Sequence, residues 1–270
     1  MEQGLKAFLV VFISVFGLIA AIFIAVLWDY IYYPIIGFKA EHAAVVYMKS
    51  EDFLIESVAY SKQFGEDKGK YLVTAHPATR PQLKFYVSVS QDFKVDEHSF
   101  KESKWRYDTI KEYAPLISQL SPGFDCYAVN INIPKELLDK FSAETQYKDI
   151  RKLHEHATEE YLFMGMAVDP YFTEQRALEY GYLVTEFMKQ RALKDASMEI
   201  IFYPKSFIES LGNDIRKNDV FTMQSDTMNS KFYREALPFK IQFDTRTGKT
   251  KTTLDLIKSP EDMKPFLTKK

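Results

Sequence analysis

An unbroken apolar run near the N-terminus constrains this chain more than any other feature of its sequence. From Ala7 to Trp28 the residues read AFLVVFISVFGLIAAIFIAVLW, with no charge and with only Ser14 and Gly17 interrupting the run. A helix of this length, at about 1.5 Å per residue, reaches roughly 33 Å, enough to cross a hydrocarbon core of about 30 Å. The run therefore predicts a single transmembrane signal-anchor helix over residues 7–28.

Aromatic residues follow the far end of this run. They are Trp28, Tyr30, Tyr32 and Tyr33, placed just before Pro34. Such side chains suit the headgroup layer, because one end of the ring is apolar and the other can stay in contact with water. We therefore expect these four residues to form the membrane interface of the anchor.

The charges that flank the run indicate an orientation. Lys6 precedes the run, and no Lys or Arg follows it until Lys39. The positive-inside rule then favours a cytoplasmic tail over 1–6 and a C-terminal domain outside the cytoplasm, in a single-pass protein of the inner (cytoplasmic) membrane. A cleaved signal peptide is the alternative, but cleavage after Ala25 would place the large Phe23 where a small residue is needed.

The rest of the chain has the composition of a folded domain. Over the whole chain, 35 Lys and Arg residues nearly balance 37 Asp and Glu residues, and the net charge of −2 gives no basic surface for a nucleic-acid partner. No repeat or Ser/Gly linker divides the sequence, which favours one compact domain. The predicted organisation is a juxtamembrane stalk over 29–45, an extracytoplasmic domain over 46–258 and a basic C-terminal tail over 259–270.

Alternating apolar and polar residues predict strands. The clearest runs are 83–90, 127–133, 239–244 and 249–257, and Gly248 allows the last two to form a hairpin. Weaker candidates are 53–60, 71–76, 161–168, 198–203 and 220–223. Alternation leaves one polar face on each strand, which is typical of antiparallel sheets.

Helical periodicity appears between several of these strands. The apolar residues of 104–120, 146–160 and 171–194 recur at helical spacing. Gly181 lies inside the last of these helices and indicates either a close approach to a neighbouring element or a tolerated glycine. The predicted fold is α+β: one transmembrane helix, then one domain with an antiparallel-dominated sheet and helices packed on it.

No catalytic motif stands out in the sequence. It has no Gly-x-Ser-x-Gly elbow, and the Gly65–Lys70 segment has the wrong spacing for a phosphate loop. We therefore predict no catalytic residue, no cofactor and no metal, and the chain is more readily interpreted as a protein without enzymatic activity.

Two patterns in the sequence suggest a metal site and a ligand-binding loop. His156 and Glu160 are four residues apart and would share one face of a helix, as two ligands of a zinc site do, although a solvent-facing helix surface is the simpler interpretation. His76 and Arg80 flank a Pro-punctuated connection, which is either a ligand-binding loop or a rigid turn.

Three functions fit these features. The favoured hypothesis is a non-catalytic interaction domain of a bacterial envelope or secretion-type assembly, inserted in the membrane and bound to an envelope protein or to further copies of itself. The alternatives are a membrane-anchored envelope hydrolase with an unrecognised site and a sensor domain that binds a small ligand. An exposed apolar patch would favour the first hypothesis, and a polar or aromatic-lined cavity would favour the others.

Overall fold

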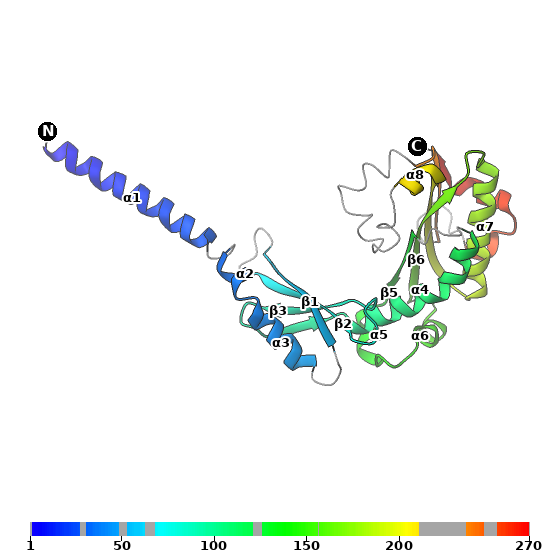
Figure 1. Ribbon diagram of the computed structural model, residues 1–270, viewed down its shortest axis with the longest axis horizontal. Helices are drawn as coiled ribbons and strands as arrows, with labels where there is room; N and C mark the ends of the chain where they lie inside the picture. The colour runs from blue at the N-terminus through cyan, green and yellow to red at the C-terminus, as the bar shows by residue number, and fades with distance from the viewer. Residues whose placement is uncertain are drawn as a thin grey trace. The chain divides into compact units, whose positions relative to one another are not determined.

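The computed structural model describes residues 2–27, 31–48, 53–62, 68–120, 126–155, 157–210, 236–245 and 253–269. These residues form helices and two β-sheets (Figure 1). The chain divides into two compact units, Met1–Ser103 and Lys104–Lys270, and each unit contains one of the sheets. The boundary falls within helix α4, Phe100–Leu120. The predicted α+β character with antiparallel-dominated pairing is confirmed, but the chain contains two sheets where one was predicted.

The first unit begins with helix α1, Glu2–Leu27. Crossing a bilayer requires about 20 consecutive apolar residues in one helix. Across the described ranges, no helix is both long enough and apolar enough to do so. This finding contradicts the predicted transmembrane helix over 7–28. The predicted membrane insertion, the single-pass inner-membrane localisation and the extracytoplasmic placement of the C-terminal domain depended on that helix and are corrected with it.

Two helices and a four-stranded antiparallel sheet follow in the first unit. The helices are α2 (Tyr33–Ile35) and α3 (Phe38–Met48). The strands, in sheet order, are β1 (Phe53–Ser61), β2 (Lys70–Pro77), β3 (Phe85–Ser90) and β4 (Val95–His98). Strands adjacent in sequence pair with one another, as expected where short connections join them.

The core of the first unit lies between α3 and this sheet. Alternate residues of β2 and β3 are buried, among them Tyr71, Val73 and Val87. Ala40 and Ala44 of α3 have no exposed surface, and their small side chains allow the helix backbone to approach the sheet closely. Segment 29–45, predicted as a stalk, thus contains α2 and part of a helix that packs in the core.

The second unit is built on a five-stranded sheet. Its strands, in order, are β5 (Cys126–Asn132), β6 (Glu159–Val168), β7 (Asp195–Pro204), β8 (Phe239–Asp244) and β9 (Leu267–Lys269). Among the described strands, only β6 and β7 pair in parallel, and α7 (Glu174–Gln190) connects them. A parallel pair needs such a crossover, because a tight hairpin reverses the strand direction.

The second unit also contains short helices. They are α5 (Lys135–Lys140), α6 (Tyr147–Leu153), α8 (Lys205–Ser210), and the 3-10 helices η3 (Leu254–Leu256) and η4 (Pro260–Phe266). One face of the sheet, which we call the core face, packs against α4 and α7 through residues such as Leu162, Met198 and Val184. The opposite face, which we call the outer face, carries α8.

Most predicted elements are present; two differ from the structure, and two lie wholly or mostly outside the described residues. The helix predicted over 146–160 ends at Leu153, and Glu159 already belongs to β6. The strand predicted over 249–257 is wrong in its described part, which is η3. Most of the predicted turn at 245–248 and the strand over 220–223 lie outside the described residues.

Candidate functional site

Ionic side chains converge around Glu160 in the interior of the second unit. Glu160 has no exposed surface. Its Oε1 accepts hydrogen bonds from Arg151 Nη1 at 2.6 Å and from Arg191 Nη2 at 2.9 Å. Its Oε2 accepts from Tyr113 Oη at 3.0 Å, and Arg191 also pairs with Glu112. The two arginines and two glutamates balance in charge, as buried ionic groups require.

Burial and charge together set the titration of this cluster. Burial raises the pKa of Tyr113 well above its ordinary value, and the adjacent negative charge of Glu160 raises it further. Burial alone would lower the pKa of Arg191, but the charge of Glu160, its hydrogen bond to Arg191, and the neighbouring Tyr113 and Glu112 together outweigh this effect and raise the pKa. Tyr113 therefore stays protonated and Arg191 stays charged at neutral pH, so the cluster is a fixed ion-pair network.

This network joins four elements of the second unit. Glu160 lies at the start of β6, Tyr113 on α4, Arg151 on α6 and Arg191 at the C-terminal cap of α7. Both Glu160 oxygens are engaged by arginine and tyrosine donors. Its sequence-based partner in a zinc site, His156, lies outside the described residues. In the part of the chain that the structure covers, no three or more His, Cys, Asp or Glu residues are grouped to hold a metal ion.

The predicted ligand loop at 76–81 is a tight turn. His76 lies in β2, and its Nδ1 is 3.1 Å from the carbonyl oxygen of Pro77. The backbone N–H of Arg80 donates to the same carbonyl at 2.9 Å, and its side chain is exposed. Neither side chain lines any of the three cavities described below.

Two of the predicted interface aromatics pack within the first unit. Tyr33 stacks on Tyr60 with ring centroids 5.0 Å apart, and its carbonyl accepts a hydrogen bond from Tyr71 Oη at 3.0 Å. Tyr32 meets the edge of Tyr33 at 5.6 Å. Tyr33 therefore attaches α2 to the sheet. Trp28 and Tyr30 lie outside the described residues.

Helix α3 presents apolar side chains on its solvent side. We define the α3 surface as the groove lined by Phe38 and Val45, which are 63 and 51 % exposed, by Glu41 and His42 between them, and by the ring of Phe93. Phe38, Glu41, His42 and Val45 follow the spacing of one helix stripe and line an open cavity of about 730 Å³ with Phe93. The α3 surface is thus a groove with apolar ends and a polar centre.

Phe93 reaches this groove through an unfavourable backbone conformation. Its φ of 58° lies in the left-handed region, which bulky L-residues rarely adopt. The ring stacks on Tyr71 with centroids 5.7 Å apart, and Lys39 Nζ lies 5.5 Å above its centre. Strain of this kind is maintained where the surrounding contacts fix the residue, and it often marks functional positions.

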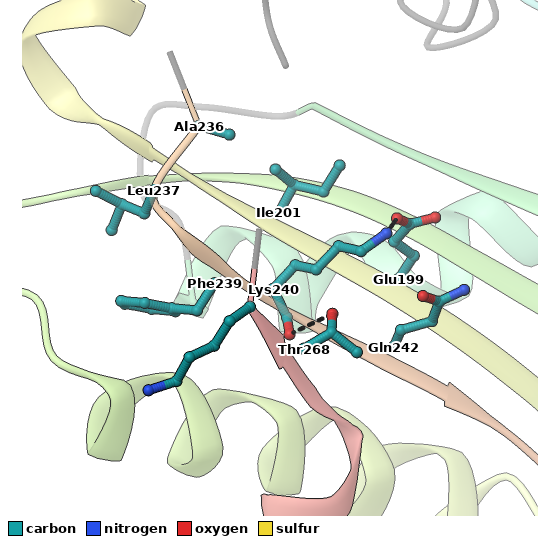
Figure 2. A pocket seen from close by; sticks show the side chains of 9 residues that line it. Glu199, Ile201, Ala236, Leu237, Phe239, Lys240, Gln242 and Thr268 are labelled. Carbon is teal, nitrogen blue, oxygen red and sulfur yellow. Dashed lines mark hydrogen bonds and ion pairs between the residues drawn. The ribbon is translucent and has the colours of Figure 1, made fainter. Parts of the chain in front are cut away.

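A second cavity, of about 200 Å³, lies on the outer face of the five-stranded sheet (Figure 2). Lys240 pairs with Glu199 in this cavity, while Ile201, Leu237 and Phe239 supply apolar surface. Glu199 also accepts a hydrogen bond from Tyr161 Oη at 3.1 Å. Burial, followed by the charge of Glu199, raises the pKa of Tyr161, so its hydroxyl remains a donor at neutral pH.

A third and larger cavity adjoins this one. It measures about 630 Å³ and shares Gln242 and Thr268 with the smaller cavity. Sequence reasoning missed both cavities, since the polar residues of the outer face looked like the ordinary solvent side of alternating strands. Only the register across β5 to β8 brings them to one place.

Comparisons with known proteins show similarity in fold. No protein-family model and no curated protein matches the chain. Among solved structures, it is similar to a DUF5037 family protein from Ruminococcus gnavus ATCC 29149, with a TM-score of 0.50 and 16 % identity over 84 % of this chain and 98 % of that one. At this identity the similarity concerns the fold alone, and the function has to be argued from the geometry.

Proposed function

We propose that this chain is a non-catalytic interaction protein that binds a partner protein through the α3 surface, as a component of a multi-protein assembly. The observation that carries the proposal is the exposure of Phe38, which is 63 % exposed on a helix whose opposite side is fully buried. The envelope or secretion type of that assembly stays a prediction from the sequence.

The apolar character of the α3 surface supports this proposal. Single exposed apolar residues are common, but several large ones that line one groove favour a surface that another molecule covers. Ile35 of α2 is also exposed, at 69 %. Described side chains of α1, such as Phe16 and Phe23, are likewise more than 60 % exposed.

The shape of the surface favours a helical segment of the partner. Phe38 and Val45 are seven residues apart on one stripe, so they lie about two helical turns from each other. A helix laid along this groove can place apolar side chains at both ends and polar side chains near Glu41 and His42. Helix-in-groove recognition uses anchors at this spacing.

Site-specific photocrosslinking of the full chain in cells tests the proposal. Val45 is replaced by a photoreactive phenylalanine analogue, with Leu153 as the control position because it is 70 % exposed in the second unit. We expect one discrete protein adduct from position 45 and none from position 153.

A second variant links the adduct to the groove. Phe38→Glu should abolish the adduct from position 45, because a charge would be buried at the interface. A position-45 adduct that persists in Phe38→Glu would contradict the proposal. So would flotation of the chain with lipid vesicles in place of any protein adduct.

A further inference from the structure

The outer face of the five-stranded sheet carries a straight row of polar side chains. Asn130 on β5 pairs in register with Tyr161 on β6, Tyr161 with Ser197 on β7, and Ser197 with Asp244 on β8. Side chains at paired positions point to the same side of a sheet, so these four lie next to one another. Their chain neighbours Val129, Leu162, Met198 and Phe243 are buried on the core face.

This row forms the floor of the 630 Å³ cavity. Glu159, Gln242 and Thr268 complete its polar lining. The apolar lining reaches the core face: Met198 and Phe243 line the cavity together with Pro265 and Phe266, and Phe266 makes an edge-to-face contact with Phe243, with centroids 4.8 Å apart. The volume lies within the range of about 300–1,000 Å³ that is typical of small-molecule sites.

The chemistry of the lining selects among ligand classes. No Lys or Arg occurs among the described residues of this cavity, so it lacks the cation that a phosphate or carboxylate ligand needs. Glu159 is buried, with 9 % of its surface exposed, and both Glu159 and Asp244 have interactions within the protein, which disfavours a ligand recognised by its positive charge. The other polar groups of the lining include the amides of Asn130 and Gln242 and the hydroxyls of Ser197 and Thr268. Both kinds of group can donate and accept hydrogen bonds.

We propose that this cavity binds a neutral saccharide. A sugar presents closely spaced hydroxyl groups that both donate and accept hydrogen bonds, which matches Asn130, Ser197, Gln242 and Thr268. The less polar face of a sugar ring can pack on Phe266 and Pro265. The Tyr161 hydroxyl donates a hydrogen bond to Glu199 Oε2 at 3.1 Å. Its phenolic oxygen is therefore held in place to accept a hydrogen bond from a sugar hydroxyl.

Saturation-transfer NMR on the full chain tests this proposal, with cellobiose, maltose and diacetylchitobiose as the probes. We expect transfer to at least one of them and no transfer to spermidine, a cation without hydroxyl groups. Transfer to none of the three saccharides would overturn the proposal. Transfer to spermidine alone would identify the surface as a cation site and would overturn it as well.

Matched amide variants locate the binding site. Gln242 is exposed on β8 and Asn130 is half-buried, so both can be changed to Ala without opening the core. Each change should weaken saccharide binding about 5- to 10-fold, through the loss of hydrogen bonds in the cavity. The control is Gln175→Ala, which removes an exposed amide from α7 and should leave the affinity unchanged. Equal affinity in the wild-type chain, Gln242→Ala and Asn130→Ala would overturn the assignment to this cavity.

Discussion

Arg191 Nη2 lies 2.9 Å from Oε1 and 3.1 Å from Oε2 of Glu160, so a single guanidinium nitrogen contacts both carboxylate oxygens. The Arg191 guanidinium also lies 4.7 Å from the ring centre of Tyr113, within cation–π range. These contacts fix the C-terminal end of α7 to the first residues of β6. They also give this fully buried carboxylate ion-pair and hydrogen-bond partners in the core.

The first prediction concerns Glu160. In Glu160→Gln, Arg151 and Arg191 lose their shared carboxylate and become incompletely paired buried charges. The free energy of unfolding of the second unit should fall by about 3 kcal/mol. The measurement is chemical denaturation followed by Trp105 fluorescence in a Trp28→Phe background, because Trp105 is fully buried in this unit.

An exposed ion pair gives the control for this variant. Glu209 lies 3.9 Å from Lys205, and both side chains are more than 60 % exposed. Glu209→Gln should change the free energy of unfolding by less than about 0.5 kcal/mol. If Glu160→Gln were no more destabilising than Glu209→Gln, the network would not contribute to stability.

The second prediction concerns Gly181 on α7. A Cβ atom at this position would lie 3.3 Å from Cγ2 of Ile241 and 3.1 Å from Cε of Met263, closer than ordinary contact. Of the two interpretations of Gly181, the close approach of α7 to Ile241 and Met263 is therefore the one that the structure supports. Gly181→Ala gains about 1 kcal/mol of helix propensity, but overpacking costs about 1–3 kcal/mol, so a net loss of stability of about 1 kcal/mol is expected.

A double-mutant cycle separates the two effects. Ile241→Ala removes both γ-carbons that a Cβ at Gly181 would meet, although alone it costs about 2–5 kcal/mol. Gly181→Ala should therefore be less destabilising in the Ile241→Ala background than in the wild type, as measured by denaturation. If the effects of the two changes on the free energy of unfolding were strictly additive, the Gly181–Ile241 contact would not determine the cost of Gly181→Ala.

The third prediction concerns His98 on β4. Its Nδ1 is buried and has no hydrogen-bond partner among the residues that the structure describes, and burial, with the charge of Lys101, lowers the pKa of His98 below its ordinary value of 6.5. The unfolded chain then binds a proton more readily than the folded one as the pH falls below 6.5. The first unit should lose stability in that range and keep it above pH 6.5.

Hydrogen exchange can measure this effect locally. Protection of the β3 and β4 amides, corrected for the intrinsic rate, should decrease from pH 7 to pH 5 in the wild type. In His98→Gln this decrease should be smaller, because the titrating group is gone. The same pH dependence in both proteins would assign the effect to another residue.

The fourth prediction concerns Tyr71, whose hydroxyl donates to the carbonyl of Tyr33. Tyr71→Phe leaves that carbonyl without its donor and should cost about 1 kcal/mol of stability at neutral pH. Burial, with the neighbouring tyrosines, raises the pKa of Tyr71 from 10.0 to about 12. The folded state therefore retains this proton longer than the unfolded state, and stability should fall as the pH rises from 10 to 12.

The Tyr71→Phe variant removes this titration. Between pH 10 and 12, its hydrogen exchange in β2 should depend less on pH than that of the wild type. Tyr86→Phe is the control, because Tyr86 is 45 % exposed on the neighbouring strand. Equal alkaline loss in Tyr71→Phe and the wild type would contradict the assignment.

Many helices and strands were predicted correctly from the sequence, because the periodicity of apolar residues that identifies them is a property of neighbouring residues. The alternation at 83–90 and 127–133 identified β3 and β5, and the stripe over 171–194 identified α7. The same reasoning extended a helix through Glu160, because charged residues at 154–160 fit a solvent-facing helix as well as the start of a strand. Pairing of Glu160 with Ala196 on β7 decides between them.

The candidate sites depended on contacts that no local pattern contains. Tyr113 and Arg191 lie 47 and 31 residues from Glu160 along the chain. Arg151 is only nine residues away but belongs to a different element, and no motif connects the four residues. Asn130, Tyr161, Ser197 and Asp244 come from four strands, and their alignment depends on register. The exposed stripe of α3 was not predicted for a different reason: residues 29–45 were interpreted as a stalk.

The sequence by itself determined the α+β character and most strand and helix positions, because apolar periodicity decides which face of an element can be buried. Tertiary structure decided that the strands form two sheets, that Glu160 binds two arginines, and that a polar row crosses four strands. It also corrected the transmembrane assignment of residues 7–28. These features depend on pairing and packing between distant segments, whose free energies cannot be read from neighbouring residues.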